Sequence, residues 1–193
     1  MKEFITPSVV ISKCIEFGHC RYNGQIIKSL FIEKLKTYIN FIPVCPEYAI
    51  GLGVPRDPID IIMDKNQKKL IQTSTGKDLT DEMINFTDSF LDSLGDVEGF
   101  ILKSRSPSCG VKSVKAYSNC KKIEPATTKA SGFFGAEVMN RYPLLGTEDE
   151  ESLMDMRIRE HFLTKIFALS RFKEINDINN LIQLHDNNKL LFT

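Results

Sequence analysis

The chain has 193 residues, of which 42% are hydrophobic and 26% are charged, a balance typical of one compact globular domain with a modest extension. Its 25 basic residues equal its 25 acidic residues, so the net charge gives no sign of a nucleic-acid-binding protein. No apolar run approaches the roughly 20 residues of a membrane-spanning helix, and the N-terminus has no signal-peptide pattern. We therefore expect a cytoplasmic protein with no membrane partner.

Charge is unevenly distributed along the chain. Residues 103–129 contain seven Lys or Arg and one acid, whereas residues 148–160 contain six acids and two Arg. The first segment could bind phosphate groups, which the second would repel. The alternative is that the two segments form solvated faces of opposite sign.

Strands and helices are expected to alternate. Short apolar runs predict strands, apolar residues at helical spacing predict amphipathic helices, and Gly or Pro marks the ends. In chain order we expect a strand at Ser8–Ser12, a helix at Gln25–Ile39, a strand at Phe41–Val44, a hairpin pairing Ile59–Met63 with Lys69–Thr73, a helix at Asp81–Leu94 capped by Thr80, a strand at Gly99–Lys103, a helix at Ser131–Arg141 and helical structure from Glu150 onward.

The alternation predicts an α/β fold, with a mostly parallel sheet and helices on both of its faces, in the Rossmann-like manner. We expect residues 1–147 to form this domain and residues 148–193 to form a C-terminal helical extension. Parallel sheets of this kind bind their ligands beyond the carboxyl ends of the strands.

Three of the five cysteines follow predicted core strands. Cys14 follows the first strand, Cys45 the second and Cys109 the third, so the fold would bring three thiols to one sheet edge. An odd number of cysteines in a reducing compartment cannot form a full set of intrachain disulfides. A cysteine is often an inert core residue, but converging thiolates repel one another unless a metal neutralises them. The pattern therefore favours a metal site.

The spacing of the cysteines bears on the metal. Zinc sites usually contain close pairs such as C-x2-C, and this chain has none. Three thiolates without an obvious fourth ligand fit a [4Fe–4S] cluster better, with one iron left open as a Lewis acid. Cys20 and Cys120 are spare thiols, and either could be a fourth ligand.

Polar residues lie close to these cysteines in the sequence. Glu47 follows Cys45 by two residues and could act as a general base, or it could be a surface carboxylate. Ser106 precedes Cys109 by three residues and could orient a water or a leaving group, a role for which Ser108 competes, or it could be a turn serine. Basic residues that flank the same loops could bind the phosphate of a nucleotide: Arg21, Arg56, Lys103 and Arg105.

Several motifs together resemble the thiouracil desulfidase family, in the order seen there. They are SKCIEFGHCRYNG at 12–24, PVCPEYAIGLGVPRDP at 43–58, TSTGKDLT at 73–80, KSRSPSCG at 103–110 and the glycine–phenylalanine segment ASGFFGAEVMNRYP at 130–143. The resemblance spans roughly residues 8–145. The combination of CPE and SPSCG in this order is its most specific part.

The resemblance implies an activity and a set of site residues. A [4Fe–4S] cluster would be held by Cys14, Cys45 and Cys109, and its open iron would take the sulfur of a 4-thiouracil ring. Water replaces that sulfur without net redox change, giving a uracil-type base and sulfide. The residues that match those implicated in activating water and moving protons are Glu47 and Ser106.

The tail resembles part of longer relatives. MRIREHFLTKIFALSRF at 156–172 is similar to their junction with an extra helical domain, and LIQLHDNNKLLFT at 181–193 is similar to the first helix of that domain. Those relatives are thought to act on 4-thiouridine in tRNA, so the expected partner is a thiolated base, its nucleotide or tRNA. Two alternatives remain: a non-catalytic metal-binding protein that interacts with RNA, and a metal-free domain with core cysteines.

Overall fold

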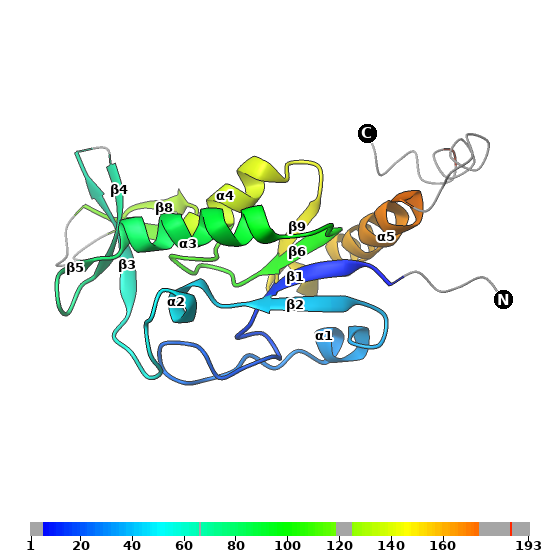
Figure 1. Cartoon of the computed structure of the whole chain (residues 1–193), viewed down its shortest axis with the longest axis horizontal. Coiled ribbons are helices and arrows are strands. Elements are labelled where there is room, and N and C mark those ends of the chain that lie inside the picture. The colour runs from blue at the N-terminus through cyan, green and yellow to red at the C-terminus, as the bar shows by residue number, and fades with distance from the viewer. Residues whose placement is uncertain (1–5, 66, 119–124, 174–185, 187–193) are drawn as a thin grey trace.

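Two sheets organise the chain in the computed structural model, which describes residues 6–65, 67–118, 125–173 and 186 (Figure 1). Within these residues a four-stranded parallel sheet has the order β2-β1-β6-β9, and a five-stranded mixed sheet has the order β5-β4-β3-β7-β8. The parallel sheet comprises β1 (Ser8–Ser12), β2 (Asn40–Val44), β6 (Gly99–Leu102) and β9 (Gly146–Asp149). The mixed sheet comprises β3 (Ile59–Asp64), β4 (Gln67–Gln72), β5 (Lys77–Asp78), β7 (Val114–Tyr117) and β8 (Pro125–Ala130).

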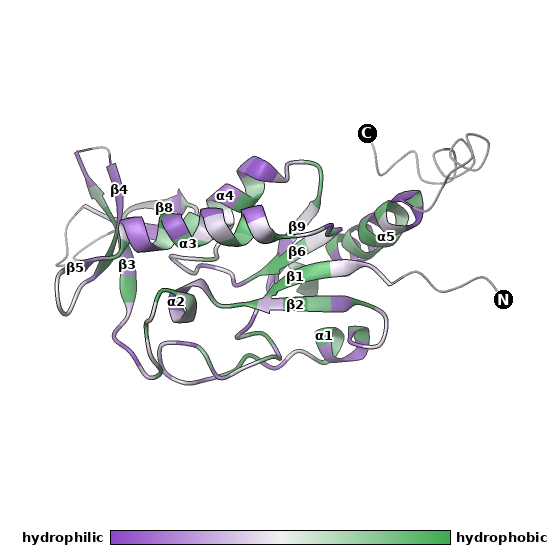
Figure 2. Cartoon of the chain, in the orientation of Figure 1, coloured by the Kyte–Doolittle hydropathy of each residue, from purple (hydrophilic) through white to green (hydrophobic). Residues whose placement is uncertain are grey.

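Helices lie on both faces of the parallel sheet. They are α1 (Leu30–Leu35), α2 (Pro46–Ala49), α3 (Thr80–Ser93), α4 (Phe133–Arg141) and α5 (Met156–Lys173), with a 3-10 turn over Ser152–Met154. Side chains of β1 alternate between two cores: Ile11 packs with residues of α1 and α5, whereas Val10 packs with residues of α3 and α4. Such burial on both faces explains why Val9–Ile11 of β1 and Phe100–Leu102 of β6 are consecutive apolar residues (Figure 2).

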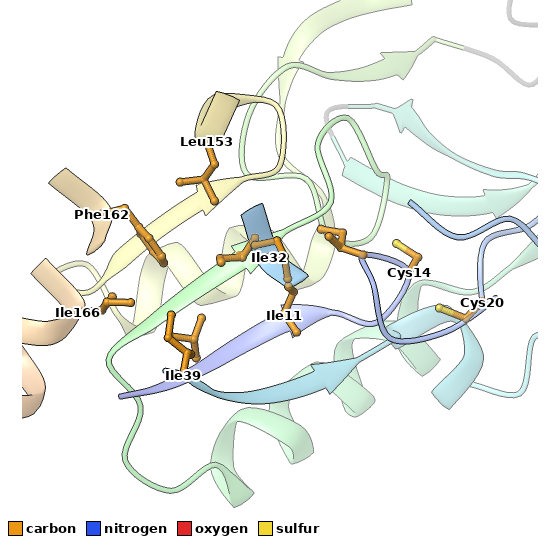
Figure 3. Close-up of a cluster of buried hydrophobic side chains, with 11 residues drawn as sticks. Ile11, Cys14, Cys20, Ile32, Ile39, Leu153, Phe162 and Ile166 are labelled. Carbon is orange, nitrogen blue, oxygen red and sulfur yellow. The ribbon is translucent and has the colours of Figure 1, made fainter. Parts of the chain in front are cut away.

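Helix α5 lies very close to the backbone of the parallel sheet at two glycines. Phe162 and Ile166 of α5 are almost fully buried against the sheet, beside Ile11 (Figure 3). A side-chain carbon at Gly99 would lie 2.9 Å from Ile166, and one at Gly146 would lie 3.1 Å from Phe162. Glycine at these strand positions therefore lets α5 lie directly on β6 and β9.

Helix α3 connects the two sheets. Leu91, near its C-terminus, packs into the core of the parallel sheet, whereas Met83, near its N-terminus, packs against Ile61 and Leu70 of the mixed sheet. The helix runs along both sheets in Figure 1. One amphipathic helix thus contributes to the cores of both sheets.

The predicted α/β fold is confirmed, as are the first strand and the antiparallel hairpin of β3 and β4. Beside the expected parallel sheet lies a second, mixed sheet, in which β3 pairs antiparallel with β4 on one side and parallel with β7 on the other. Strand β9 was not anticipated, although it forms one edge of the parallel sheet. Its sequence, GTED, has no apolar residue to signal a strand.

Three helix boundaries differ from the prediction. The helix expected over Gln25–Ile39 is restricted to α1, because Ile27 forms a bridge with Ile15 in extended conformation instead. The helix expected at Ser131–Arg141 begins at Phe133. Thr80 is the first residue of α3 and not its cap, since its hydroxyl accepts the Leu70 N–H and donates to a neighbouring carboxylate.

The predicted division at residue 147 stays a prediction. Within the expected extension, α5 packs into the main core, while residues 174–185 and 187–193 lie outside the described part of the chain. None of the described helices combines the length and the apolar character that crossing a membrane would need.

Candidate functional site

The C-terminal edge of the parallel sheet opens into a cavity of about 330 Å³, a volume within the usual range of small-molecule sites. Cys14, Cys45 and Cys109 all line it, in the loops that follow β1, β2 and β6. A fourth thiol, that of Cys20, lines the same cavity. Cys120 lies outside the described residues. The parallel pairing of β1 with β2 and β6 explains why these loops meet at one edge.

Cys45 and Glu47 are positioned by the short helix α2. Cys45 has extended backbone angles and is the N-cap of α2, and Pro46 occupies the first turn, where its missing N–H costs nothing. Glu47 follows in that first turn and lines the cavity. The CPE motif therefore converts the end of β2 into a turn that directs a thiol and a carboxylate to the same space.

The loop carrying Cys109 rests on the start of α4. The N–H groups of Gly132 and Gly135 donate to the carbonyls of Gly110 (2.7 Å) and Ser108 (3.1 Å). A side-chain carbon at Gly135 would lie 2.5 Å from the Cys109 carbonyl oxygen. Glycine at the start of α4 is thus what allows the Cys109 loop to lie against this helix.

The thiols influence one another. A hydrogen bond with Cys14 is the main reason why the pKa of Cys20 rises to about 11. Hydrogen bonding with Cys20, followed by burial, raises the pKa of Cys45, while burial raises the pKa of Cys109. Without a cation the thiols of Cys20, Cys45 and Cys109 are therefore protonated at neutral pH, and metal binding would have to displace their protons.

Glu47 is held by two partners. Its Oε2 accepts from Arg56 Nη2 (2.5 Å) and Nε (3.0 Å), and its Oε1 accepts from the hydroxyl of Ser108 (3.0 Å). The Arg56 side chain is only 5% exposed and that of Glu47 is 15% exposed. Arg56 Nη2 also donates to the carbonyl of Cys20 (3.0 Å), so one guanidinium connects the carboxylate with the Cys20 loop.

The two serines of SPSCG take different positions. Ser108 is fully buried behind Glu47, whereas Ser106 lines the cavity. Ser106 Oγ accepts the N–H groups of Ser108 (3.2 Å) and Cys109 (3.1 Å). Because it acts as an acceptor in both bonds, its own hydroxyl proton is left to donate elsewhere.

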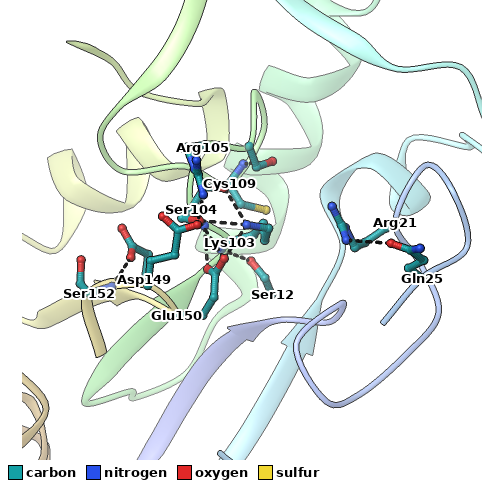
Figure 4. A network of polar contacts seen from close by, with 12 residues as sticks. Ser12, Arg21, Gln25, Lys103, Ser104, Arg105, Cys109, Asp149, Glu150 and Ser152 are labelled. Atoms are coloured by element: carbon teal, nitrogen blue, oxygen red, sulfur yellow. Dashed lines mark hydrogen bonds and ion pairs between the residues drawn. The ribbon is translucent and has the colours of Figure 1, made fainter. Parts of the chain in front are cut away.

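The predicted phosphate-binding residues are mostly engaged with acids. Lys103 pairs with Glu150, whose carboxylate also accepts from the backbone N–H and the hydroxyl of Ser104 (Figure 4). Arg105 pairs with Glu151. The basic and acidic segments of the sequence therefore meet at these positions.

Arg21 differs from the other three basic residues predicted to bind phosphate. It lies on a separate loop (Figure 4), donates to Gln25 (3.4 Å) and lies over the ring of Tyr22. Of the four, it alone has no carboxylate partner within the described part of the chain. It lines the cavity, as do Lys103, Arg105 and Arg56.

Several contacts of the site were not predicted. Glu150 and Glu151 come from the segment after β9, and no sequence pattern indicated that this segment reaches the cavity edge. The contact between Ser108 and Glu47 joins residues 61 positions apart. The signal that could have found it is the pairing of CPE with SPSCG, which places both residues next to proposed ligands.

The donor set fits an iron–sulfur cluster by its chemistry. Four thiols face one cavity, and thiolates are the ligands that hold such clusters. No three His, Cys, Asp or Glu side chains within the described ranges are gathered closely enough to hold a single metal ion.

Comparison with known proteins agrees with this architecture. Residues 9–150 match the model of the 2-thiouracil desulfurase family, and the chain belongs to that family. An uncharacterized protein of Bacillus subtilis (strain 168), YbbK, is 32% identical over 109 residues, which cover 53% of this chain and 72% of YbbK. The solved structure of the [4Fe–4S]-dependent thiouracil desulfidase TudS is similar in fold, with a TM-score of 0.61 and 24% identity, covering 80% of this chain and 97% of TudS.

Proposed function

We propose that the chain is a [4Fe–4S]-dependent desulfidase that converts a thiolated pyrimidine to the corresponding oxo base with release of sulfide. The observation that carries the proposal is the meeting of Cys14, Cys45 and Cys109 in one cavity with an oriented carboxylate, that of Glu47. The family to which the chain belongs supports the same reaction class. The reaction exchanges a C=S bond for a C=O bond at the cost of one water and is redox-neutral.

Three residues have the proposed role of ligands. Cys14, Cys45 and Cys109 would hold the cluster through their thiolates after losing their protons. When bound, the cluster supplies an iron that acts as a Lewis acid on the sulfur of the substrate. The burial of Cys14 and Cys109 limits the access of water to these bonds.

Glu47 has the proposed role of general base. Its Oε2 accepts two hydrogen bonds from Arg56, whereas its Oε1 accepts one from Ser108 and so retains a lone pair for the proton of an attacking water. We assign Arg56 and Ser108 as positioning residues, since both act through Glu47. Arg56 was predicted to bind substrate phosphate, but its guanidinium is already occupied by Glu47 and two carbonyl groups.

Ser106 and the basic residues have proposed roles toward the substrate. The free hydroxyl proton of Ser106 can donate to a ring or leaving-group atom in the cavity, while its oxygen holds the backbone of Cys109. Arg21 is the best placed of the basic residues to bind an anionic substrate group, because no acid neutralises it within the described residues. Lys103 and Arg105 would contribute less, since each already has a carboxylate partner.

The form of the substrate is proposed from the resemblance. The free base, its nucleotide and 4-thiouridine in tRNA all carry the same reacting group. The resemblance of residues 148–193 to the start of a helical domain in longer relatives motivates the tRNA substrate. Turnover on equal concentrations of 4-thiouracil, 4-thiouridine monophosphate and thiolated tRNA would rank the three by kcat/KM.

The test begins with iron and acid-labile sulfide after anaerobic reconstitution. We expect about four of each per chain and loss of the thiocarbonyl absorbance of 4-thiouracil on turnover. Each of Cys14→Ala, Cys45→Ala and Cys109→Ala should lose both the cluster and the activity. The proposal gives Cys120 no ligand role, so Cys120→Ala is the matched control for loss of one thiol and should keep both. Zinc alone, or folded wild-type protein that takes up no iron, would overturn the proposal.

A further inference from the structure

The thiol of Cys20 has no role in the function proposed above, although it lies among the proposed ligands. It lines the same cavity as Cys14, Cys45 and Cys109 and is only 5% exposed. It forms hydrogen bonds with the thiols of both Cys14 and Cys45. Four thiols, and not three, therefore face the space that a cluster would occupy.

The chain brings Cys20 back to the cavity through a fixed turn. Glu16 has a positive φ of 66°, which reverses the chain after Cys14. The Glu16 carboxylate is buried, accepts the backbone N–H of Ser29 (2.5 Å) and pairs with Lys28 (3.6 Å) and Lys36 (3.7 Å). These partners hold the reversal in place, so the return of Cys20 is built into the fold of this loop.

A second set of contacts holds the backbone carbonyls of the Cys20 loop. Arg56 donates its Nη2 to the Cys20 carbonyl (3.0 Å) and its backbone N–H to the Tyr22 carbonyl (2.8 Å). The Cys45 thiol also donates to the Cys20 carbonyl (3.8 Å). The position of Cys20 is thus tied to Cys45 and, through Arg56, to Glu47.

A [4Fe–4S] cluster usually has four cysteine ligands, whereas the function proposed above needs one iron that can accept the sulfur of the substrate. These two requirements are met if the fourth ligand is a thiolate that can be displaced. We propose that Cys20 is this ligand: its thiolate occupies the fourth iron at rest and leaves when the sulfur of the substrate binds. This inference rests on the proposed function.

The exchange is redox-neutral and balanced. Cys20 leaves the iron with the electron pair of its thiolate and takes one proton from solvent, while the sulfur of the substrate donates a pair in its place. When the oxo base has left and the sulfur has left the iron as hydrogen sulfide, the Cys20 thiol releases that proton and binds the iron again. The displaced thiol stays beside the cavity, because the backbone carbonyl of Cys20 is held by Arg56.

Two measurable properties follow from a displaceable fourth thiolate. The fourth iron is shielded from chelators and oxidants in the absence of substrate. The substrate must also compete with Cys20, so its apparent affinity is reduced by the fraction of protein in the open state. Removing the thiol should therefore expose the iron and lower KM together, a combination that loss of a purely structural core thiol does not produce.

The experiment compares wild type, Cys20→Ala and Cys20→Ser as reconstituted holoproteins, with Cys120→Ser as the control for loss of one thiol. Each is exposed anaerobically to EDTA and a mild oxidant, ferricyanide, and the remaining iron is counted while electron paramagnetic resonance detects a three-iron cluster. We expect wild type and Cys120→Ser to keep about four irons and both Cys20 variants to keep about three. The KM for 4-thiouracil should fall in the Cys20 variants.

Two results would overturn the inference while leaving the proposed function intact. If the Cys20 variants keep the fourth iron as well as wild type and have the same KM, Cys20 is not a ligand. If they lose the whole cluster, Cys20 is a permanent ligand and not a displaceable one. A wild-type protein that takes up no cluster overturns the proposed function itself, so the two failures can be told apart.

Discussion

The two sheets of the molecule differ in the edges at which their strands end. In the parallel sheet, β1, β2 and β6 all end at the same edge, and the loops that follow them carry every cysteine that lines the cavity. In the mixed sheet, the antiparallel pairs β3–β4, β4–β5 and β7–β8 send successive strand ends to opposite edges. The parallel sheet therefore brings reactive side chains together, whereas the mixed sheet mainly buries apolar surface.

The comparison predicts that a change at the parallel edge alters chemistry more than stability. Glu47→Gln should keep the cluster but lower turnover by about 10²–10⁴-fold, the usual contribution of a general base. Iron content and 4-thiouracil turnover on the same sample provide the measurement. Asp64→Asn, at an exposed carboxylate of the mixed sheet, is the control and should leave turnover unchanged. Normal turnover in Glu47→Gln would remove Glu47 from the mechanism.

In the mixed sheet, a change is expected to alter stability more than chemistry. Ile61 is fully buried, so Ile61→Ala should lower the free energy of unfolding by about 2–5 kcal/mol through lost contacts and a cavity. Below its melting temperature the variant should still bind its full iron. Ile11→Ala, an equal deletion at an equally buried position in the parallel sheet, should cost similar stability and also reduce iron uptake. Equal iron loss in both variants would show that iron uptake depends on the packing of both sheets.

A third variant sharpens the comparison at the loop of Cys109. Alanine normally favours a helix over glycine, but Gly135→Ala would place a carbon 2.5 Å from the Cys109 carbonyl oxygen. We expect a loss of about 1–3 kcal/mol in unfolding free energy and lower iron content. Gly95→Ala, where no atom lies within 4 Å, should change stability by at most about 0.5 kcal/mol. A stabilised Gly135→Ala would contradict the close approach.

The smallest expected effect concerns pH. Burial raises the pKa of Glu148 in β9, so the ionised carboxylate costs stability in the folded protein above the carboxyl titration range. Glu148→Gln removes this cost and should stabilise slightly at pH 7. The gain should vanish as the pH falls below the unfolded pKa, where the native carboxyl is protonated in both states. Urea melts at pH 7 and pH 3 would detect the difference, and an equal gain at both values would argue against it.

The part of the site that sequence could predict is the part set by strand ends. The apolar runs before Cys14 and Cys45 mark where the chain leaves the sheet, so the convergence of the thiols follows from the expected parallel pairing. Glu47 is adjacent to Cys45 and was placed for the same reason. Local patterns are sufficient here because each residue lies within a few positions of a strong strand signal.

The rest depends on partners distant in sequence. Nothing local indicates that Arg56 pairs with Glu47 or that Ser108, and not Ser106, donates to that carboxylate. The pairing of Lys103 with Glu150 depends on β9, whose polar sequence gives no strand signal. The helix predicted over Gln25–Ile39 was too long for a similar reason. Ile27 fits the helical spacing of apolar residues, but in the structure it forms a β-bridge with Ile15, a partner that the local pattern does not indicate.

The proposed ligands come from three loops that are far apart along the chain but adjacent in the fold. A cluster joining them would act as a crosslink that an unfolded chain could keep only by closing two long loops, at a cost in conformational entropy. Because the assembled site exists only in the folded protein, cluster binding and folding are thermodynamically linked. Loading with iron and sulfide should therefore raise the melting temperature. The bonds between the three cysteines and the cluster would then serve both catalysis and the stability of the sheet edge.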